Sequence, residues 1–197
     1  MNDNYNIMGM FPLRLFLLHQ ERTTLHVYEP RFLQLISDCI QDETYFGIPF
    51  QSKTKFHEHG SIVKVVEVVK EYENGEIDVL VECVQNFRLV SFEAKKADRL
   101  YPSGAIKLLT PLSIDHNEEL IEYASDYNKL LFKQEESEPE SLDIRKVISL
   151  LSLKDEEKLK LFRYNPIKQI QFLIHKLKYM SILVHKEKLV AHQYHLN

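Results

Sequence analysis

Two cysteines and nine histidines are the side chains of this sequence best suited to covalent or metal chemistry. A cysteine becomes a nucleophile when a neighbouring base or positive charge stabilises its thiolate. Cys39, however, falls on the apolar side of a helical pattern, and Cys83 falls on the inward side of an alternating strand pattern. An apolar setting raises the pKa of a thiol and makes it inert. We therefore expect both cysteines to be structural and predict no catalytic residue.

The histidines offer two short chelating spacings, His57-x-His59 and His192-x-x-His195. A structural zinc site takes four ligands from Cys, His or carboxylate side chains. No third ligand accompanies either pair at a recognised spacing. We therefore expect neither a metal nor another cofactor.

A Glu-Pro-Arg triplet at residues 29–31 joins a strand-like segment to a helical one. Glu29 and Arg31 have the chemistry of a catalytic acid and an anchor, but an ion pair at a helix start explains them better. Pro30 suits the first helical turn, where its missing N–H costs nothing. Arg88 is expected to cover the sheet with its stem and to pair at the rim, with binding of an acidic ligand as the alternative.

Short strand patterns fill the first 111 residues. The clearest is a hairpin over 60–92, where two β-branched runs flank Asn74-Gly75, a dipeptide that readily supplies the positive φ angles of a type I′ turn. Beyond the turn, alternate residues should face the core; they are Ile77, Val79, Val81 and Cys83. Further apolar runs predict strands over 11–18, 44–51 and 104–112. Strands this closely spaced indicate a curled antiparallel sheet or small barrel.

The run at 11–18 is apolar on both faces of the predicted strand. Phe11, Leu13, Leu15 and Leu17 share one face, while Phe16 and Leu18 make the other face apolar too. Such a strand is either buried centrally or presents one face to a partner. We favour burial, with binding as the alternative.

Helical patterns appear once among the strands and throughout the rest of the chain. One helix starts at Pro30, with apolar residues at helical spacing. After Pro111, periodic apolar residues predict helices over 116–133, 139–153, 154–164 and 165–196. Asn165 and Pro166 suit the N-cap and first position of the last helix, and an acidic stretch at 133–141 joins the first two. The predicted fold class is α+β.

Composition narrows the class of protein. The chain has 197 residues, of which 44% are hydrophobic and 27% charged, with a formal charge of −4. That balance gives no reason to expect nucleic acid as a partner, and no apolar run reaches the roughly 20 residues that span a bilayer. The first residues lack a basic start and a cleavage site, so they do not form a signal peptide. We expect a cytoplasmic protein that binds no membrane.

Three blocks of sequence, in order, resemble the Lon N-terminal domain family. Residues 10–50 contain a Phe-Pro-Leu strand, and "LHVYEPRF" at 25–32 resembles the family's Leu-x-Ile-Phe-Glu-x-Arg-Tyr segment. Residues 73–92 resemble its Asp-Gly hairpin, with Phe87-Arg88-Leu89 in the following motif. Residues 151–180 resemble its helical close. The resemblance covers about residues 10–180.

The sequence departs from the family pattern at three places. The usual Pro-Gly before the second motif is "HQER" at 19–22, the glycine of the later motif falls near Cys83, and the usual Leu-Leu-Glu is Leu161-Phe162-Arg163. These departures concern local turns. The resemblance implies a PUA-like antiparallel β-barrel with one inserted helix over 1–113, followed by a helical bundle over 114–197.

The resemblance also implies a function. Lon N-terminal domains help to recognise unfolded or damaged polypeptides, and this chain has no G-x-x-x-x-G-K-[ST] phosphate loop and no recognisable protease nucleophile. We therefore expect a non-catalytic polypeptide-binding module whose partners are unfolded or damaged polypeptide segments and a separate ATPase or protease. Binding is assigned to apolar strand residues, the helix start and one sheet arginine, namely Phe11, Leu13, Phe16, Glu29, Arg31, Phe32 and Arg88.

Two other functions remain as alternatives. A PUA-like domain can bind RNA, although the acidic balance disfavours contacts to phosphate. A small hydrolase with an unrecognised site is the second alternative. An extended peptide adding to a free sheet edge is a further way in which the predicted barrel could bind polypeptide.

Overall fold

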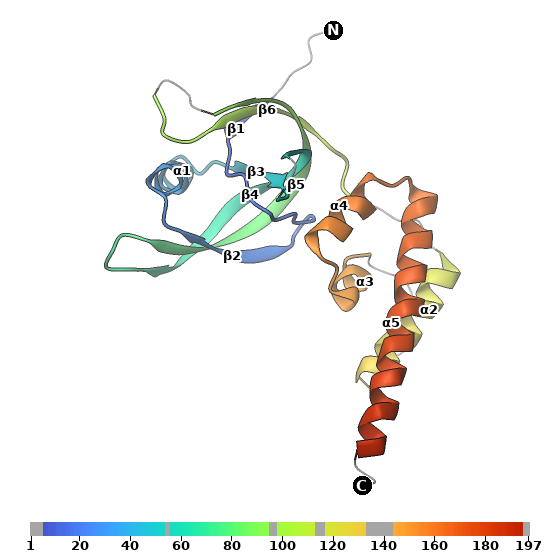
Figure 1. Ribbon diagram of the computed structural model, residues 1–197. Helices are drawn as coiled ribbons and strands as arrows, with labels where there is room; N and C mark the ends of the chain where they lie inside the picture. Colours follow the sequence, from blue (N-terminus) through green and yellow to red (C-terminus); the bar gives the residue numbers. More distant parts are fainter. Residues whose placement is uncertain (1–5, 54–55, 95–97, 113–116, 133–143, 195–197) are drawn as a thin grey trace. The chain divides into compact units, whose positions relative to one another are not determined.

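The computed structural model describes residues 6–53, 56–94, 98–112, 117–132 and 144–194 (Figure 1). The chain divides into two compact units, 1–111 and 112–197. In the described residues, a sheet and one helix form the first unit, and four helices form the second, so the fold is α+β as predicted. The predicted boundary between residues 113 and 114 lies outside the described residues. No helix in the described segments is both long and apolar enough to cross a bilayer.

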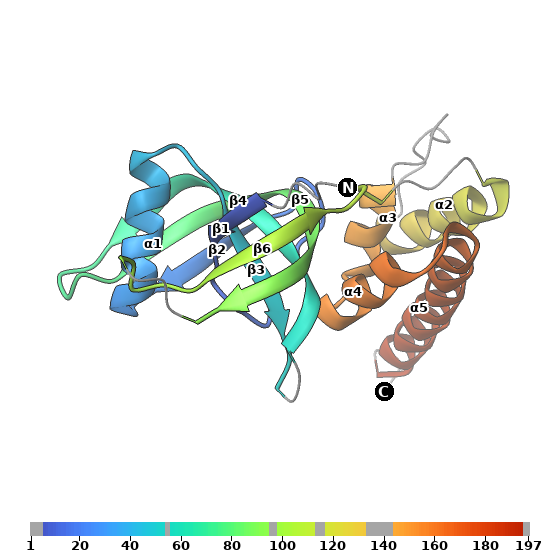
Figure 2. The same ribbon diagram turned by 90° about the horizontal axis from the view of Figure 1, so that it is seen from above.

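Six antiparallel strands form one curled sheet in the first unit (Figures 1 and 2). Their order is β1-β6-β5-β4-β3, and β2 also pairs with β5. The strands are β1 (Asn6–Gly9), β2 (Arg22–Val27), β3 (Phe46–Gln51), β4 (Phe56–Glu71), β5 (Ile77–Glu93) and β6 (Ser103–Leu108). One edge of β5 pairs with β4, while the other pairs first with β2 and then with β6. The long β4–β5 hairpin is therefore the centre of the sheet.

The turn of this hairpin differs from the predicted type. Gly75 has a φ of 85°, whereas Asn74 is not among the described residues with positive φ. The Gly75 N–H donates to the Tyr72 carbonyl (2.9 Å), and the Tyr72 N–H donates to the Glu76 carbonyl (2.9 Å). This is a three-residue loop, a type I turn followed by a left-handed glycine. The hairpin is confirmed, but the type I′ turn is wrong because only one residue adopts positive φ.

Helix α1 (Pro30–Gln41) of the sheet unit begins where predicted. Glu29 is its N-cap residue, and its carbonyl accepts hydrogen bonds from Phe32 and Leu33 (2.9 and 3.0 Å). The Glu29 side chain makes no capping bond. It accepts instead from Arg31, whose Nε and Nη2 both lie 2.8 Å from Oε2. The charges around Pro30 therefore form the expected ion pair at a helix start.

The core of the sheet unit lies between α1 and the inner side of the sheet. Phe32, Leu35 and Ile36 of α1 are at most 3% exposed and belong to one apolar cluster with residues of β2 to β5. The alternation predicted for β5 is confirmed. Val79, Val81 and Cys83 are fully buried, and Ile77 at the start of the strand is half-buried against the same cluster. The buried apolar face of α1 is what holds the helix on the sheet.

The strand predicted over 11–18 is wrong. The segment makes only two isolated parallel bridges, Met10–Gly47 and Leu13–Phe50. Further along, buried side chains take the place of a neighbouring strand, since the Leu17 carbonyl accepts from Ser61 Oγ and Asn86 Nδ2 (both 2.8 Å). Burial of its apolar side chains is nevertheless confirmed for Phe11, Phe16, Leu17 and Leu18.

The second unit contains four helices in the described segments: α2 (Glu118–Phe132), α3 (Ile144–Leu151), α4 (Asp155–Arg163) and α5 (Pro166–Tyr194). The predicted cap of α5 is confirmed, because Asn165 Oδ1 accepts from the Lys168 N–H (2.9 Å). Lys178 ties α5 to α2, with Nζ 4.3 Å from the Tyr123 ring centre and 3.5 Å from Glu119. The predicted acidic stretch at 133–141 lies outside the described residues.

Candidate functional site

A groove of about 330 Å³ runs between the end of α1 and strand β4. Residues 39, 40 and 43–45 line one wall, and residues 64–68 line the other. We call this feature the α1–β4 groove. It arises because α1 packs on the sheet through its buried face, while the turn after α1 leads directly into β3.

Strand β4 presents an unpaired edge along this groove. Strand β3 pairs with β4 only as far as the Phe46–Val63 pair, but β4 continues to Glu71 against β5. In the part of the chain that the structure describes, no strand pairs with residues 64–71 on the side opposite β5. An exposed strand edge offers backbone N–H and C=O groups to another extended chain.

Exposed apolar side chains accompany the unpaired edge. Val66 and Val68 of β4 are 39% and 37% exposed, and Ile40 and Tyr45 across the groove are 46% and 50% exposed. All four line the α1–β4 groove. Side chains of this kind are suited to covering apolar residues of a bound segment.

Cys39 is the groove residue with the most reactive type of side chain, and its setting keeps it inert. The thiol belongs to a residue that is 5% exposed and part of the main core cluster. Burial raises its pKa above the ordinary thiol value. The groove therefore has the character of a binding surface, and Cys39 contributes to its floor.

The end of α1 makes one wall of the groove acidic. Asp42 is the C-cap of α1, and Glu43 follows it with a φ of 51° in the left-handed region. The Thr44 N–H donates to the Cys39 carbonyl (3.0 Å), which completes a Schellman-type ending that usually carries glycine at this position. The last turn of α1 contains no basic residue.

Lys64 is the one cation among the described residues that line the groove, and it is already engaged. Lys64 Nζ lies 2.9 Å from Glu82 Oε1, and Arg22 Nη2 lies 2.5 Å from Oε2 of the same carboxylate. The hydrogen bonds from Lys64 and Arg22 hold the pKa of Glu82 below its ordinary value. The Lys64 charge is therefore turned towards the sheet and its neighbour strand β5.

A polar network fixes the α1 wall on its other side. Asp38 accepts from Arg99 and from the Tyr101 hydroxyl (2.8 Å for the tyrosine), and Arg99 Nη1 lies 2.6 Å from that hydroxyl. Burial, followed by the hydrogen bond to Asp38, raises the pKa of Tyr101 to about 12. Gln34, one turn before Asp38, accepts from the Leu100 N–H (2.9 Å). These contacts fasten α1 to the segment that precedes β6.

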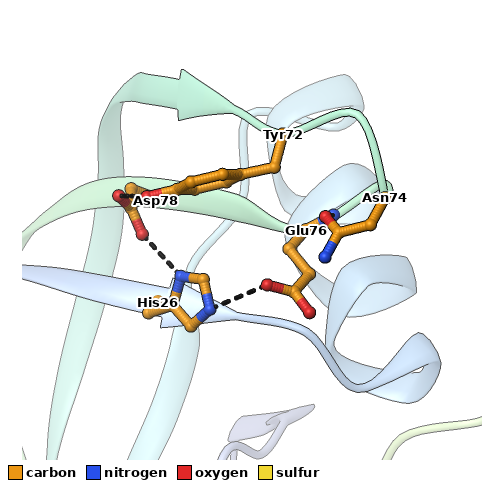
Figure 3. Close-up of polar contacts among 5 residues, drawn as sticks. All are labelled: His26, Tyr72, Asn74, Glu76 and Asp78. Atoms are coloured by element: carbon orange, nitrogen blue, oxygen red, sulfur yellow. Dashed lines mark hydrogen bonds and ion pairs between the residues drawn. The ribbon is translucent and has the colours of Figure 1, made fainter.

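A second polar cluster lies at the tip of the β4–β5 hairpin (Figure 3). His26 of β2 lies between two carboxylates, with Nδ1 2.7 Å from Asp78 Oδ1 and Nε2 3.0 Å from Glu76 Oε2. The Tyr72 hydroxyl donates to the other oxygen of Asp78 (2.8 Å). The hydrogen bond to Asp78 is the main cause that raises the pKa of His26, and its counterpart lowers the pKa of Asp78.

This cluster joins β2 to the hairpin. The described residues include no group of three or more potential ligands arranged to hold a metal ion. His26, Glu76 and Asp78 are exposed or half-buried. Their ion pairs link β2 to the hairpin at the protein surface, and the stability of this link depends on the charge of His26.

Four of the residues predicted to bind lie at or near the start of α1. Phe11 stacks on Phe32 with ring centres 3.8 Å apart, and Arg31 lies over the outer face of Phe32, 4.4 Å from its centre. Phe11 and Phe32 are 6% and 3% exposed. Their binding role stays a prediction, and the structure places them in the core rather than on an exposed surface. The Glu29–Arg31 pair remains exposed.

The other three predicted residues are scattered over the sheet unit. Phe16 is fully buried against Phe50, and Leu13 bridges to the same residue of β3. Arg88 lies exposed on β5, directly opposite His59 of β4 and Lys107 of β6. The α1–β4 groove contains none of the seven predicted residues.

One feature of the sequence, the valine-rich stretch at residues 65–69, indicates the groove but was not among the predicted binding residues. Residues 65–69 read Val-Val-Glu-Val-Val. This half of β4 therefore lacks the regular alternation of apolar and polar residues that is typical of a strand with one solvent-exposed face. Valines on both faces of a strand that pairs on one side only indicate an exposed apolar edge.

Comparisons with known proteins place these features in a family context. The family model for the ATP-dependent protease La (LON) substrate-binding domain matches residues 10–171. No curated protein matches the chain. Solved structures that share the fold include two Lon N-terminal domains. A Lon N-terminal domain protein from Xanthomonas campestris has 20% identity and a TM-score of 0.68, covering 86% of this chain and 98% of its own. The N-terminal domain of Mycobacterium avium complex Lon protease has 12% identity and a TM-score of 0.57, covering 88% and 98%.

Proposed function

Because the chain belongs to the family of the ATP-dependent protease La (LON) substrate-binding domain, we propose that it binds extended polypeptide segments along the α1–β4 groove. The observation that carries this proposal is the unpaired edge of β4, residues 64–71, with exposed valines beside it. A bound segment would add to the sheet as one more strand.

Strand addition explains how such a site distinguishes unfolded from folded polypeptide. The backbone groups of the β4 edge are common to every extended segment, so hydrogen bonds to them carry little sequence preference. A folded protein has most of its backbone groups paired internally. Only an unfolded or locally opened segment can therefore place its own N–H and C=O groups against β4.

The apolar groove residues supply the second part of the interaction. Val66 and Val68 lie on the strand that accepts the segment, and Ile40 and Tyr45 face them across the groove. Unfolded segments expose apolar side chains that folded proteins bury. Covering those side chains in the groove favours binding through the removal of apolar surface from water.

The role that we propose for this part of the protein is binding rather than bond cleavage. The matched family is a substrate-binding domain, and the cysteines that could act as nucleophiles, Cys39 and Cys83, are both buried free thiols. The predicted ATPase or protease partner, the cytoplasmic location and the absence of nucleic-acid binding stay predictions.

The proposal is tested by blocking the edge of β4. A charged side chain on an edge strand disfavours strand addition. The variant Val68→Lys should therefore bind an unfolded protein about tenfold more weakly or worse. The unfolded protein is a fluorescently labelled one that has been reduced and carboxymethylated. Fluorescence anisotropy measures the dissociation constant. Val90→Lys is the matched control, because Val90 is also an exposed strand valine, 44% exposed on β5, outside the groove.

Three outcomes separate the possibilities. Weak binding by Val68→Lys and normal binding by Val90→Lys support the proposed site. Equal binding by both variants and the unchanged protein would mean that polypeptide binds elsewhere. An unchanged protein that binds no unfolded polypeptide would overturn the proposed function itself. Thermal unfolding of each variant establishes that the substitutions leave the fold intact.

A further inference from the structure

Two carboxylates that line the α1–β4 groove, Glu43 and Glu67, and a third beside it, Asp42, have no ion-pair partner among the described residues. Asp42 and Glu43 end α1, and Glu67 lies on the opposite wall. Nearby, Asp38 is already matched by Arg99 and Lys64 by Glu82. The groove therefore keeps an excess of negative charge.

The end of α1 increases this excess. The last carbonyls of a helix carry a partial negative charge that favours a cation nearby, yet the last turn of α1 has no basic residue. Asp42 and Glu43 instead add two carboxylates at that end. Of the two, Glu43 lines the groove. A positively charged group placed in this end of the groove would interact favourably with the Glu43 carboxylate and with the helix terminus.

Glu43 is unfavourable in its own position for two reasons. Its φ of 51° lies in the region that glycine and asparagine adopt most easily. Its negative charge lies at the negative end of a helix. Places where a local rule is broken are often those where the side chain serves a function. Since Glu43 lines the groove, that function would be to interact with whatever the groove binds.

We propose that the α1–β4 groove prefers polypeptide segments that carry a lysine or arginine beside apolar residues, with Glu43 and Glu67 setting this preference. The inference rests on the proposed function, because it describes which segments the same groove selects. The valines cover the apolar side chains, and the two carboxylates on opposite walls receive the cation. A segment with glutamate at that position would be repelled.

The expected size of the lysine preference follows from the solvent exposure of Glu43 and Glu67. Both carboxylates are exposed, and pairs between exposed charges are individually weak and screened by salt. Two carboxylates and a helix end acting on one cation should together give about a fivefold preference for lysine over glutamine. The preference should decrease as the salt concentration rises.

Three matched peptides test the inference. Each alternates valine and threonine and differs only in a central lysine, glutamine or glutamate. Fluorescence anisotropy with the full chain should give the tightest binding for lysine, about fivefold weaker binding for glutamine, and still weaker binding for glutamate. In the double variant Glu43→Gln, Glu67→Gln, the three peptides should bind with similar affinity. Glu73→Gln, in the hairpin turn outside the groove, is the control and should keep the preference.

The outcomes distinguish this inference from the proposed function. If all three peptides bind the unchanged chain equally, and Val68→Lys weakens all of them, the groove binds polypeptide but the charge preference is wrong. If the preference is present and survives in the double variant, Glu43 and Glu67 do not set it. If no peptide binds, the proposed function and this inference are both wrong.

Discussion

Glu43 shows how one residue can oppose the stability of the fold that contains it. Replacing it with glycine removes the strain of a left-handed backbone at a non-glycine residue and the charge at the helix end. We expect Glu43→Gly to raise the free energy of unfolding by about 1 kcal/mol, measured by urea denaturation. The same variant should weaken the lysine preference of the groove, because Glu67 remains.

Glu43→Gln is the matched comparison, because it removes the charge but keeps a side chain at positive φ. Its gain in stability should be smaller than that of Glu43→Gly. If Glu43→Gly lowers the stability, then the Glu43 side chain makes a favourable contribution that outweighs its backbone conformation.

Single residues also explain where the sequence could not be interpreted correctly. The run at 11–18 has the composition of a strand, and its burial was predictable. Its conformation was not, because the Leu17 backbone bonds to Ser61 and Asn86, residues 44 and 69 positions away. Periodicity within a segment contains no information about such distant side chains.

At the scale of elements, the hairpin tip should make stability depend on pH. The His26 pKa is raised in the folded protein by Asp78 and Glu76, so its contribution is fully present below the unfolded-state pKa of about 6.5 and is lost as pH rises through the folded-state value. The stability difference between the unchanged protein and His26→Gln should therefore be larger near about pH 6 than near about pH 8.5.

Urea denaturation at the two pH values measures this difference. Asp78 stays ionised over that range, because its pKa is lowered from an ordinary value that is already acidic. Asp78→Asn removes the main partner of His26 and provides the control, since the pH dependence should shrink in that background. A difference that is the same at both pH values would show that the His26 charge does not stabilise the hairpin tip.

Elements differed in how far the sequence predicted them. The helix from Pro30, the central hairpin and the capped helix from Asn165 each combine a periodic pattern with a local start or turn signal, and all three are confirmed. The groove was not predicted, because it depends on β3 ending its pairing at Val63 while β4 continues. Strand lengths and pairing partners are set by tertiary contacts, which a single segment does not reveal.

At the scale of the whole molecule, the two units have their own buried residues. The cluster beneath α1 draws only on residues up to Tyr101, and a second cluster in the sheet unit consists of Met10, Ile62, Phe87 and Ile106. We therefore expect residues 1–111 to fold alone. Circular dichroism of that fragment should show a β-rich spectrum and a cooperative thermal transition.

The fragment also separates the contributions of the two units to binding. The α1–β4 groove lies wholly in residues 1–111, so the fragment should bind the lysine peptide as the full chain does. A folded fragment that no longer binds would mean that the helical unit takes part in recognition. A fragment without a cooperative transition would show that the sheet unit depends on the helices.

The two bulges in the unpaired part of β4 affect how long a bound segment stays bound, as well as how tightly it binds. Pairing of β4 with β5 is irregular between Val65 and Glu67 and again between Val68 and Lys70, and each bulge bends and twists the strand locally. A segment added to this edge would meet regular backbone for only about two residues at a stretch. A segment that is paired over such short stretches should dissociate quickly, because only a few hydrogen bonds must break together. We expect brief residence times, which would let the protein sample many segments in turn and pass them on.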